Sequence, residues 1–184
     1  MTYQPLTEPP RHGDWMQTYT GRQFWPLDAR ADEVDIVDIA HALSQTCRYG
    51  GHCEQFYSVA EHSVLCSLVV PAEHALQALL HDATEAYLVD VPRPIKRFLG
   101  NYEQIEQALA FVIGQHFGVE LEHLDPSVKA ADNAVLLAEA DEIMKPHPAP
   151  WCIPGEPAEV SIHCYQPRDA EALFLARYQE LTRG

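Results

Sequence analysis

Residues 79 to 90, LLHDATEAYLVD, constrain the fold most, because ionisable side chains interrupt an apolar segment there. The leucine pair is typical of a buried helix, yet His81 and Asp82 follow at once, and Glu85 and Asp90 lie further along. Burying so many ionisable groups costs free energy unless a metal ion or a mutual network compensates them. The segment therefore predicts a compensated polar site within a helical core.

Length and composition predict one globular domain that spans residues 1–184. Hydrophobic residues make up 47% of the chain and charged residues 21%, which are ordinary values for a globular protein. No apolar run approaches the roughly 20 residues of a membrane span, and the N-terminal sequence lacks the basic and apolar regions of a signal peptide. We therefore expect a cytoplasmic protein without a membrane partner.

Helical periodicity dominates the chain after its first 34 residues and predicts an all-α bundle of about six helices. The expected helices lie near residues 35–46, 59–70, 72–88, 102–117, 127–144 and 167–181. Within the single domain we expect an irregular N-terminal wrap over 1–34, a helical core over 35–145, and a Pro-rich loop with a C-terminal helix over 146–184.

Capping signals support these helix boundaries. Ser58 and Glu61 form a capping-box pattern, in which each side chain satisfies a backbone amide of the other residue. Asn101 and Asp125 are expected N-caps. Gly118 is placed to end the helix that precedes it.

Charge and cysteine content exclude two classes of protein. The net charge of −15 predicts a surface that repels a nucleic-acid polymer, although an anionic small molecule is still compatible with a local cation. The odd number of cysteines and the absence of a Cys-x-x-Cys pair argue against a disulfide framework and a structural zinc site. We therefore predict free thiols at Cys47, Cys53, Cys66, Cys152 and Cys164.

Three predicted helices carry polar residues at apolar positions. His81 and Glu85 are four residues apart and share a helix face, with Asp82 beside them. His62 lies in an otherwise apolar helix, and Asp132 interrupts the alanine-rich VKAADNAV. Two histidines and two carboxylates could bind a divalent metal and leave positions open for water and a substrate oxygen. A purely structural salt-bridge network is the alternative.

The segments VAEHS, LLHDATEAYLVDVPRPIK and VKAADNAV resemble the HD superfamily of metal-dependent phosphohydrolases over roughly residues 45–140. The resemblance implies an all-α HD domain whose metal ligands are His62, His81, Asp82 and Asp132. It also implies one divalent transition metal ion, which would be zinc, cobalt or manganese.

The extended run from the HD pair to Pro92 is more specific than the dipeptide, and it resembles the branch of bacterial 5′-deoxynucleotidases and phage dATP triphosphohydrolases. By this resemblance Glu85 and Asp90 are catalytic acids that orient the attacking water and transfer protons. Which of them is the acid and which the base stays open.

The same branch carries an arginine and a tryptophan before the first metal histidine. Here Arg48 and Tyr49 occupy that place, so the resemblance implies phosphate binding by Arg48 and contact of Tyr49 with the base. Tyrosine replaces tryptophan, which weakens the assignment of base stacking. Pro92 and Lys96 are expected to close the same pocket, and the alternative for Lys96 is a solvated helix position.

These residues predict metal-dependent hydrolysis of deoxynucleotide phosphates, with a 5′-deoxynucleotidase acting on dNMPs as the first hypothesis. A phage-type dATP triphosphohydrolase and a non-catalytic metal-binding or nucleotide-sensing HD module are the alternatives. The expected partner is a small deoxynucleotide, in the cytoplasm of a bacterial cell or a phage-infected host. We also expect a homo-oligomer.

Overall fold

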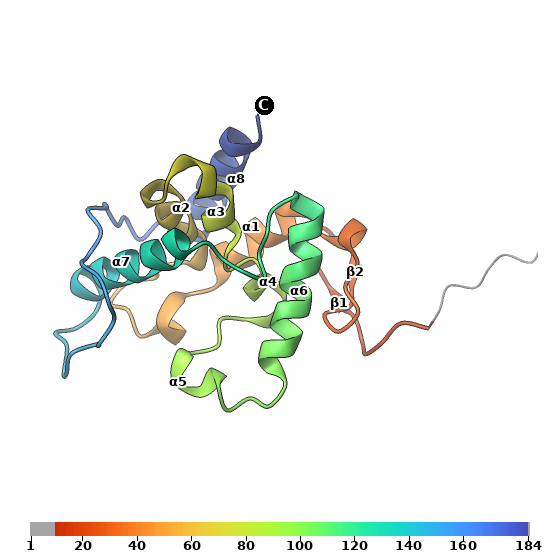
Figure 1. Cartoon of the computed structure of the whole chain (residues 1–184), viewed down its shortest axis with the longest axis horizontal. Helices are drawn as coiled ribbons and strands as arrows, with labels where there is room; N and C mark the ends of the chain where they lie inside the picture. The colour runs from red at the N-terminus through yellow and green to blue at the C-terminus, as the bar shows by residue number, and fades with distance from the viewer. Residues whose placement is uncertain (1–9, 184) are drawn as a thin grey trace, which may run out of the picture.

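The computed structural model describes residues 10–183 and is predominantly helical (Figure 1). The helices are α1 (Ile36–Gln45), α2 (Val59–Val69), α3 (Ala75–Leu80), α4 (Glu85–Leu88), α5 (Arg93–Lys96), α6 (Tyr102–Phe117), α7 (Pro126–Ile143) and α8 (Pro167–Thr182), with the 3-10 helices η1 (Ala31–Glu33), η2 (Arg48–Gly51) and η3 (Ala72–His74). In the part of the chain that the structure describes, the named strands are β1 (Met16–Gln17) and β2 (Gln23–Phe24), which pair antiparallel. The predicted all-α class is confirmed.

Helix α2 lies at the centre of the bundle. Every residue of its segment 59–67 is buried, because α1, α3, α7 and α8 all pack against it. A helix that is apolar on all sides is typical of a central position in a core. A polar side chain on α2, such as that of His62, therefore faces other helices and not solvent.

The N-terminal segment joins the core through an aromatic pair. The rings of Phe24 and Tyr87 stack with their centroids 3.9 Å apart, and Phe24 is fully buried. The short hairpin of β1 and β2 thus contacts α4 through this pair, while positions 1–9 of the predicted N-terminal wrap lie outside the described residues. No helix in the described part of the chain is long and apolar enough to cross a membrane.

The capping predictions were right at three sites. The Ser58 side chain accepts a hydrogen bond from the Glu61 amide, and the Asp125 side chain caps α7. Gly118 ends α6 with a φ of 68°, which is the left-handed conformation that favours glycine. Asn101 makes no side-chain capping bond, so that prediction was wrong.

The reciprocal half of the predicted capping box was also wrong. The Glu61 carboxylate does not return to Ser58, because it accepts hydrogen bonds from the amides of His163 and Tyr165 at 2.8 and 2.9 Å. This buried carboxylate therefore ties the irregular connection before α8 to α2. The local pattern could not reveal hydrogen-bond donors about 100 residues away in the sequence.

The predicted helix over 72–88 is interrupted. It divides into η3, α3 and α4, with turns at residues 81–84. The amides of Ala83 and Glu85 bond to the carbonyls three residues earlier, at 3.0 Å each, so the backbone tightens where a regular helix would continue. The HD pair thus lies in a turn between two short helices, and not on a single helix face.

Gly114 gives a test of how closely α6 packs. A Cβ at this position would lie 2.5 Å from the carbonyl oxygen of Val119, on the segment that leaves the helix. Helix propensity alone predicts that Gly114→Ala is stabilising, but the clash with backbone should dominate. We expect a loss of about 1–3 kcal/mol in the free energy of unfolding, measured by urea denaturation. The exposed change Gln107→Ala on α6 is the control, and a Gly114→Ala protein as stable as that control would refute the close contact.

Candidate metal centre

The four predicted metal ligands come together from three separate parts of the fold. His62 belongs to α2, the HD pair to the turn after α3, and Asp132 to α7. Nε2 of His62 lies 3.4 Å from Oδ1 of Asp132 and 3.9 Å from Oδ2 of Asp82, and Nε2 of His81 lies 3.2 Å from that same Oδ2. Ligand atoms around a tetrahedral zinc ion lie about 3.4 Å apart. The three distances bracket that value, so these side chains could contribute to one site for a divalent ion.

The imidazole of His81 is oriented as a metal ligand would be. Its Nδ1 lies 2.8 Å from the carbonyl oxygen of Ala78, so Nδ1 donates to that carbonyl and leaves a lone pair on Nε2. The side chain is only 4% exposed, and Nε2 makes no hydrogen bond to the described residues but lies 3.2 Å from Oδ2 of Asp82. A buried nitrogen that faces a carboxylate and a second imidazole is placed as a metal ligand would be.

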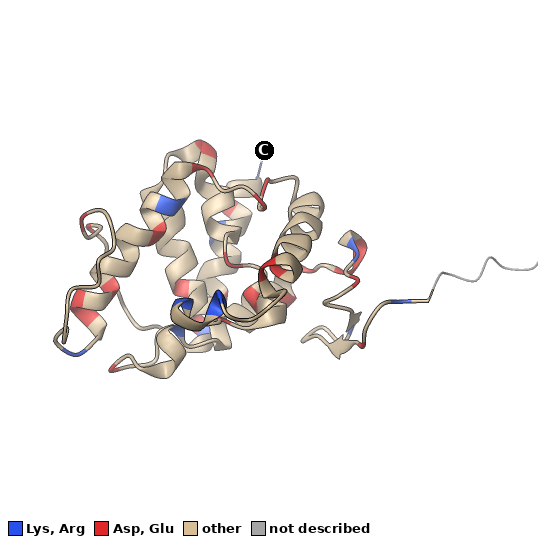
Figure 2. Cartoon of the chain, turned by 60° about the horizontal axis from the view of Figure 1, so that its bottom comes forward, with Lys and Arg blue, Asp and Glu red and all other residues tan. Residues whose placement is uncertain are grey.

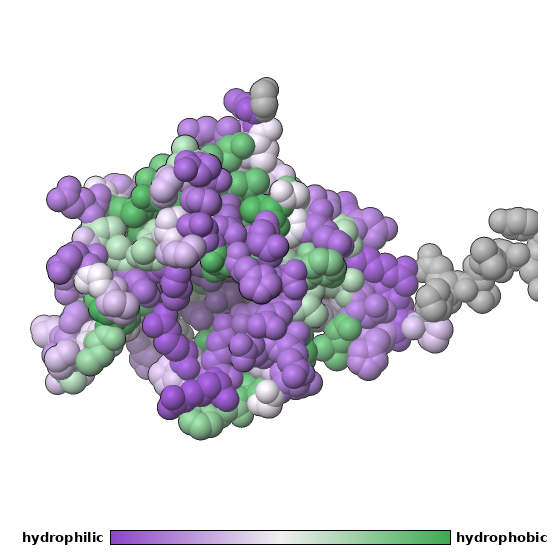
Figure 3. All heavy atoms as spheres, viewed as in Figure 1, coloured by the Kyte–Doolittle hydropathy of each residue, from purple (hydrophilic) through white to green (hydrophobic). Residues whose placement is uncertain are grey.

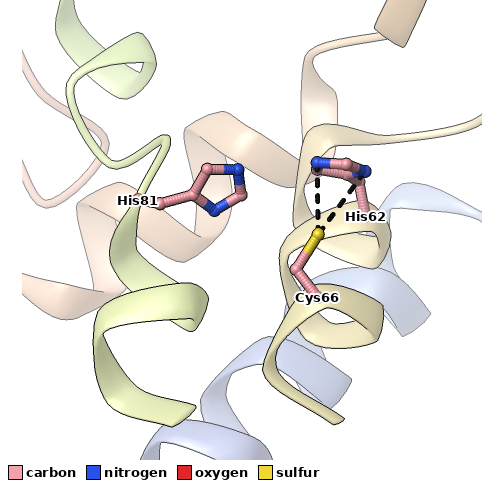
Figure 4. Close-up of side chains that lie close together, drawn as sticks. All are labelled: His62, Cys66 and His81. Atoms are coloured by element: carbon pink, nitrogen blue, oxygen red, sulfur yellow. Dashed lines mark hydrogen bonds between the residues drawn. The ribbon is translucent and has the colours of Figure 1, made fainter. Parts of the chain in front are cut away.

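Cys66 is a residue of this centre that the sequence did not identify. It follows His62 by four residues on α2, and its Sγ lies 3.4 Å from Nε2 of His62 (Figure 4). His62, Cys66 and His81 together could hold a metal ion. The spacing of four residues was visible in the sequence, but buried free cysteine is common in apolar helices and so gives a weak signal.

Glu139 on α7 is the second residue that the sequence did not identify. Its fully buried carboxylate lies 2.6 Å from Nδ1 of His62 and accepts hydrogen bonds from Arg48 and from the hydroxyls of Tyr49 and Tyr57. Burial alone would raise the pKa of Glu139, but Arg48 and His62 outweigh it and lower the pKa to about 2. The ionised carboxylate fixes the imidazole of His62 so that Nε2 faces the metal centre.

Arg48 connects this network to the HD pair. Its guanidinium is buried, bonds to Glu139 through Nε and Nη2 at 3.1 and 3.0 Å, and approaches Oδ2 of Asp82 to 3.9 Å. Tyr49 follows in the left-handed conformation, with a φ of 56°, and directs its hydroxyl to Glu139 while Trp151 meets its ring edge-on. Arg48 therefore lies beside the centre, whereas the hydroxyl of Tyr49 points into the buried network.

The two predicted catalytic acids have raised pKa values, in contrast to the predicted metal ligand Asp132. Burial, then the charges of Asp82 and Asp90, raise the pKa of Glu85 well above its usual range, and burial also raises the pKa of Asp90. Burial would raise the pKa of Asp132 as well, but the hydrogen bond and charge of His62 outweigh it and lower that pKa. When neighbouring carboxyl groups differ in pKa, the group with the higher pKa can donate a proton while the group with the lower pKa stays ionised and can act as a ligand.

The backbone just before Asp90 is strained. Val89 has a φ of 67° and a ψ of 154°, a conformation that is essentially restricted to glycine. The hydroxyl of Tyr102 donates to the Val89 carbonyl at 3.2 Å, and the Val89 amide donates to the Glu85 carbonyl at 3.0 Å. These bonds hold the chain in a sharp turn at the point where Asp90 leaves α4.

Pro92 and Lys96, which were expected to close the pocket, lie at the two ends of α5. Pro92 is exposed and precedes the first residue of that helix. Nζ of Lys96 bonds to the Glu106 carboxylate on α6 at 2.6 Å. Lys96 therefore already has an acidic partner, although its charge also acts on Glu85 and Asp90.

The face that carries α5, α6 and α7 is hollowed and mostly hydrophilic at its centre (Figure 3). Two open pockets, of about 370 and 340 Å³, lie elsewhere, against the N-terminal segment. The first contains Leu27, Ile105 and Val112, and the second contains Tyr19 and His41. Neither pocket includes a residue of the candidate metal centre. The candidate site is therefore located by the chemistry of its side chains and not by either of these cavities.

Replacing Glu139 should test the buried network. Glu139→Ala leaves Arg48 and His62 without their shared acceptor, and breaking a buried ion pair costs about 3–5 kcal/mol of unfolding free energy. Glu139→Gln keeps an acceptor oxygen and should lose less. Chemical denaturation measures both, with the exposed Glu142→Ala on the same helix as a control. Equal stability of Glu139→Ala and Glu142→Ala would show that the network contributes nothing.

Comparison with known proteins places the chain among bacterial relatives. No model of a known protein family matches it. It is 37% identical over 171 residues to the uncharacterized protein YfdR of Escherichia coli, covering 91% of this chain and 96% of the relative. It is 31% identical over 193 residues to the uncharacterized protein RCAP_rcc00048 of Rhodobacter capsulatus, covering 92% of this chain and 96% of that relative. The chain belongs to the same protein family as YfdR and RCAP_rcc00048.

Proposed function

We propose that this protein is an HD-type phosphohydrolase that removes the 5′-phosphate from deoxynucleoside monophosphates. The observation that carries the proposal is the grouping of His62, His81, Asp82 and Asp132, in which Nε2 of each histidine lies within 3.9 Å of an aspartate oxygen. Nε2 of His81 is buried and faces the Asp82 carboxylate at 3.2 Å. Burial raises the pKa values of two further carboxyl groups in the same region, Glu85 and Asp90.

One divalent transition metal ion is the proposed cofactor. The two histidines and two aspartates named above would hold zinc, cobalt or manganese, which accept nitrogen and oxygen ligands. A bound ion of this kind lowers the pKa of water and polarises a phosphoryl oxygen. The orientation of the ligands depends on Glu139 behind His62 and on the Ala78 carbonyl behind His81.

Arg48 is proposed to bind the phosphate. Its guanidinium reaches Asp82 from one side and is held by Glu139 on the other, so it approaches the centre without filling it. Arginine can grip two phosphate oxygens at once, which lysine cannot reproduce. The aromatic face of Tyr49 is the proposed contact for the base.

Glu85 and Asp90 are proposed to handle the protons. A carboxyl group with a raised pKa keeps its proton to higher pH and can donate it to a leaving oxygen, while the ionised partner accepts a proton from water. Oε2 of Glu85 is buried and has no hydrogen-bond partner, so it is available for such an exchange. The strained turn at Val89 would keep Asp90 directed toward the same space.

A triphosphate substrate is the second candidate. The short segment around α5 carries Arg93, Lys96 and Arg97, and Figure 2 shows a gathering of basic residues at the front of the molecule in that segment. A longer chain of phosphates could reach these side chains from the metal centre. In that complex Lys96 would have to break its ion pair with Glu106 in order to bind phosphate. This requirement favours a monophosphate over a triphosphate as the substrate.

Substrate panels should separate these candidates. The purified protein, loaded with zinc, cobalt or manganese, is incubated with each dNMP and dNTP, and the nucleoside, inorganic phosphate and triphosphate products are identified. We expect inorganic phosphate and nucleoside from dNMPs. Triphosphate release from dATP would favour the second candidate, whereas metal binding without turnover would favour a nucleotide-sensing module of the cytoplasm.

Asp82→Ala should lose both metal and activity, because it removes the carboxylate that approaches both imidazoles. We expect at least a 10-fold loss of metal affinity, measured by titration with zinc and by elemental analysis. Asp141→Ala removes an exposed carboxylate of α7 and should retain both properties. Full metal content and activity in Asp82→Ala would overturn the site assignment.

A further inference from the structure

Two cysteine side chains meet at the base of the η2 loop. Sγ of Cys47 lies 3.6 Å from Sγ of Cys53, which is about van der Waals contact for two sulfur atoms. Both residues are partly exposed, so a small solute can reach them. The five residues between them include Arg48 and Tyr49, whose side chains both bond to Glu139.

The backbone on both sides of this pair is fixed by hydrogen bonds. Cys47 and Ser58 form an antiparallel bridge, and the Arg48 amide donates to the Tyr57 carbonyl at 2.9 Å. At the other end the Glu54 amide donates to the Ile143 carbonyl on α7 at 2.8 Å. The two sulfur atoms are therefore brought together by the fold, and side-chain rotation is the main movement needed to join them.

We propose that Cys47 and Cys53 form a reversible disulfide that closes the Arg48 loop. The oxidant is hydrogen peroxide. In the first step Cys47 sulfur attacks a peroxide oxygen, the O–O bond breaks, and water and a sulfenic acid form. In the second step Cys53 sulfur attacks the Cys47 sulfur, the S–O bond breaks, and a second water leaves. The two thiols together lose two electrons and two protons to the peroxide.

The chemistry of the two thiols assigns the order of these steps. Burial, and then the hydrogen bond with Cys47, raise the pKa of Cys53 to about 11, so Cys53 remains a thiol at neutral pH. Attack on peroxide requires a thiolate, which makes Cys53 the less reactive partner and leaves the first step to Cys47. Cys53 then reacts with a sulfur that is already in contact with it.

The crosslink would act on the loop that presents Arg48. Tyr49, Gly50 and Gly51 all have positive φ values, between 56° and 81°, so the loop holds a conformation that few sequences favour. A bond between its ends removes alternative conformations of the unfolded chain. This inference does not depend on the hydrolase proposal, because it concerns thiols and the loop between them.

Mass spectrometry tests the crosslink directly. Reduced full-length protein is treated with hydrogen peroxide, blocked, and digested with trypsin, which cleaves after Arg48 and so separates the two cysteines. We expect one linked pair of peptides that carry residues 47 and 53, two hydrogens lighter than the thiol forms, and released by dithiothreitol. The oxidised protein should also melt roughly 5 °C higher than the reduced one.

Variants decide between this pair and other cysteines. Cys53→Ser and Cys53→Ala should both lose the linked peptides and the rise in melting temperature, while Cys152→Ser, which changes an exposed cysteine, should keep both. A link from Cys47 to Cys164, a link that persists without Cys53, or thiols at 47 and 53 that stay reduced while Cys152 oxidises would each overturn the proposal.

Discussion

The contact between the Glu139 carboxylate and the imidazole of His62 holds the site together. It joins α7 to the most buried helix of the protein, and Arg48 brings the η2 loop to the same carboxylate. A buried negative charge is tolerated only where positive and hydrogen-bonding groups surround it, and here they do. Because the same contact sets the direction of Nε2 of His62, the stability of the core and the geometry of the metal centre depend on one side chain.

Departures from regular structure position the remaining groups. The helix over 72–88 breaks at the HD pair, which lets His81 turn its ring toward α2 and bond to the Ala78 carbonyl. The strained backbone at Val89 then turns the chain before Asp90. A regular helix would have spread these side chains along one stripe, whereas the two turns direct them to one point.

Electrostatics separates the carboxyl groups into two kinds. Asp132 and Glu139 face positive or hydrogen-bonding partners, which keep their pKa values low. Burial and the charges of neighbouring carboxylates keep the pKa values of Glu85 and Asp90 high. A division of this kind would suit the proposed hydrolysis, in which metal ligands stay ionised and a proton donor stays protonated. It arises from the placement of the residues, because all four are ordinary acids in the sequence.

The sequence by itself determined the all-α class and most helix boundaries, because periodicity and caps are local properties. The grouping of His62, His81, Asp82 and Asp132 was implied by the resemblance to the HD superfamily and not by spacing. The tertiary structure decided what those residues contact. The sequence did not identify Glu139 and Cys66 as residues of the candidate site, because a single acid or thiol in an apolar helix forms no recognisable pattern. Asn101 precedes α6 but is exposed and makes no side-chain capping bond, for which the structure gives no reason. The long helix at the HD pair was mispredicted because local preference gives way where burial and distant partners stabilise another conformation.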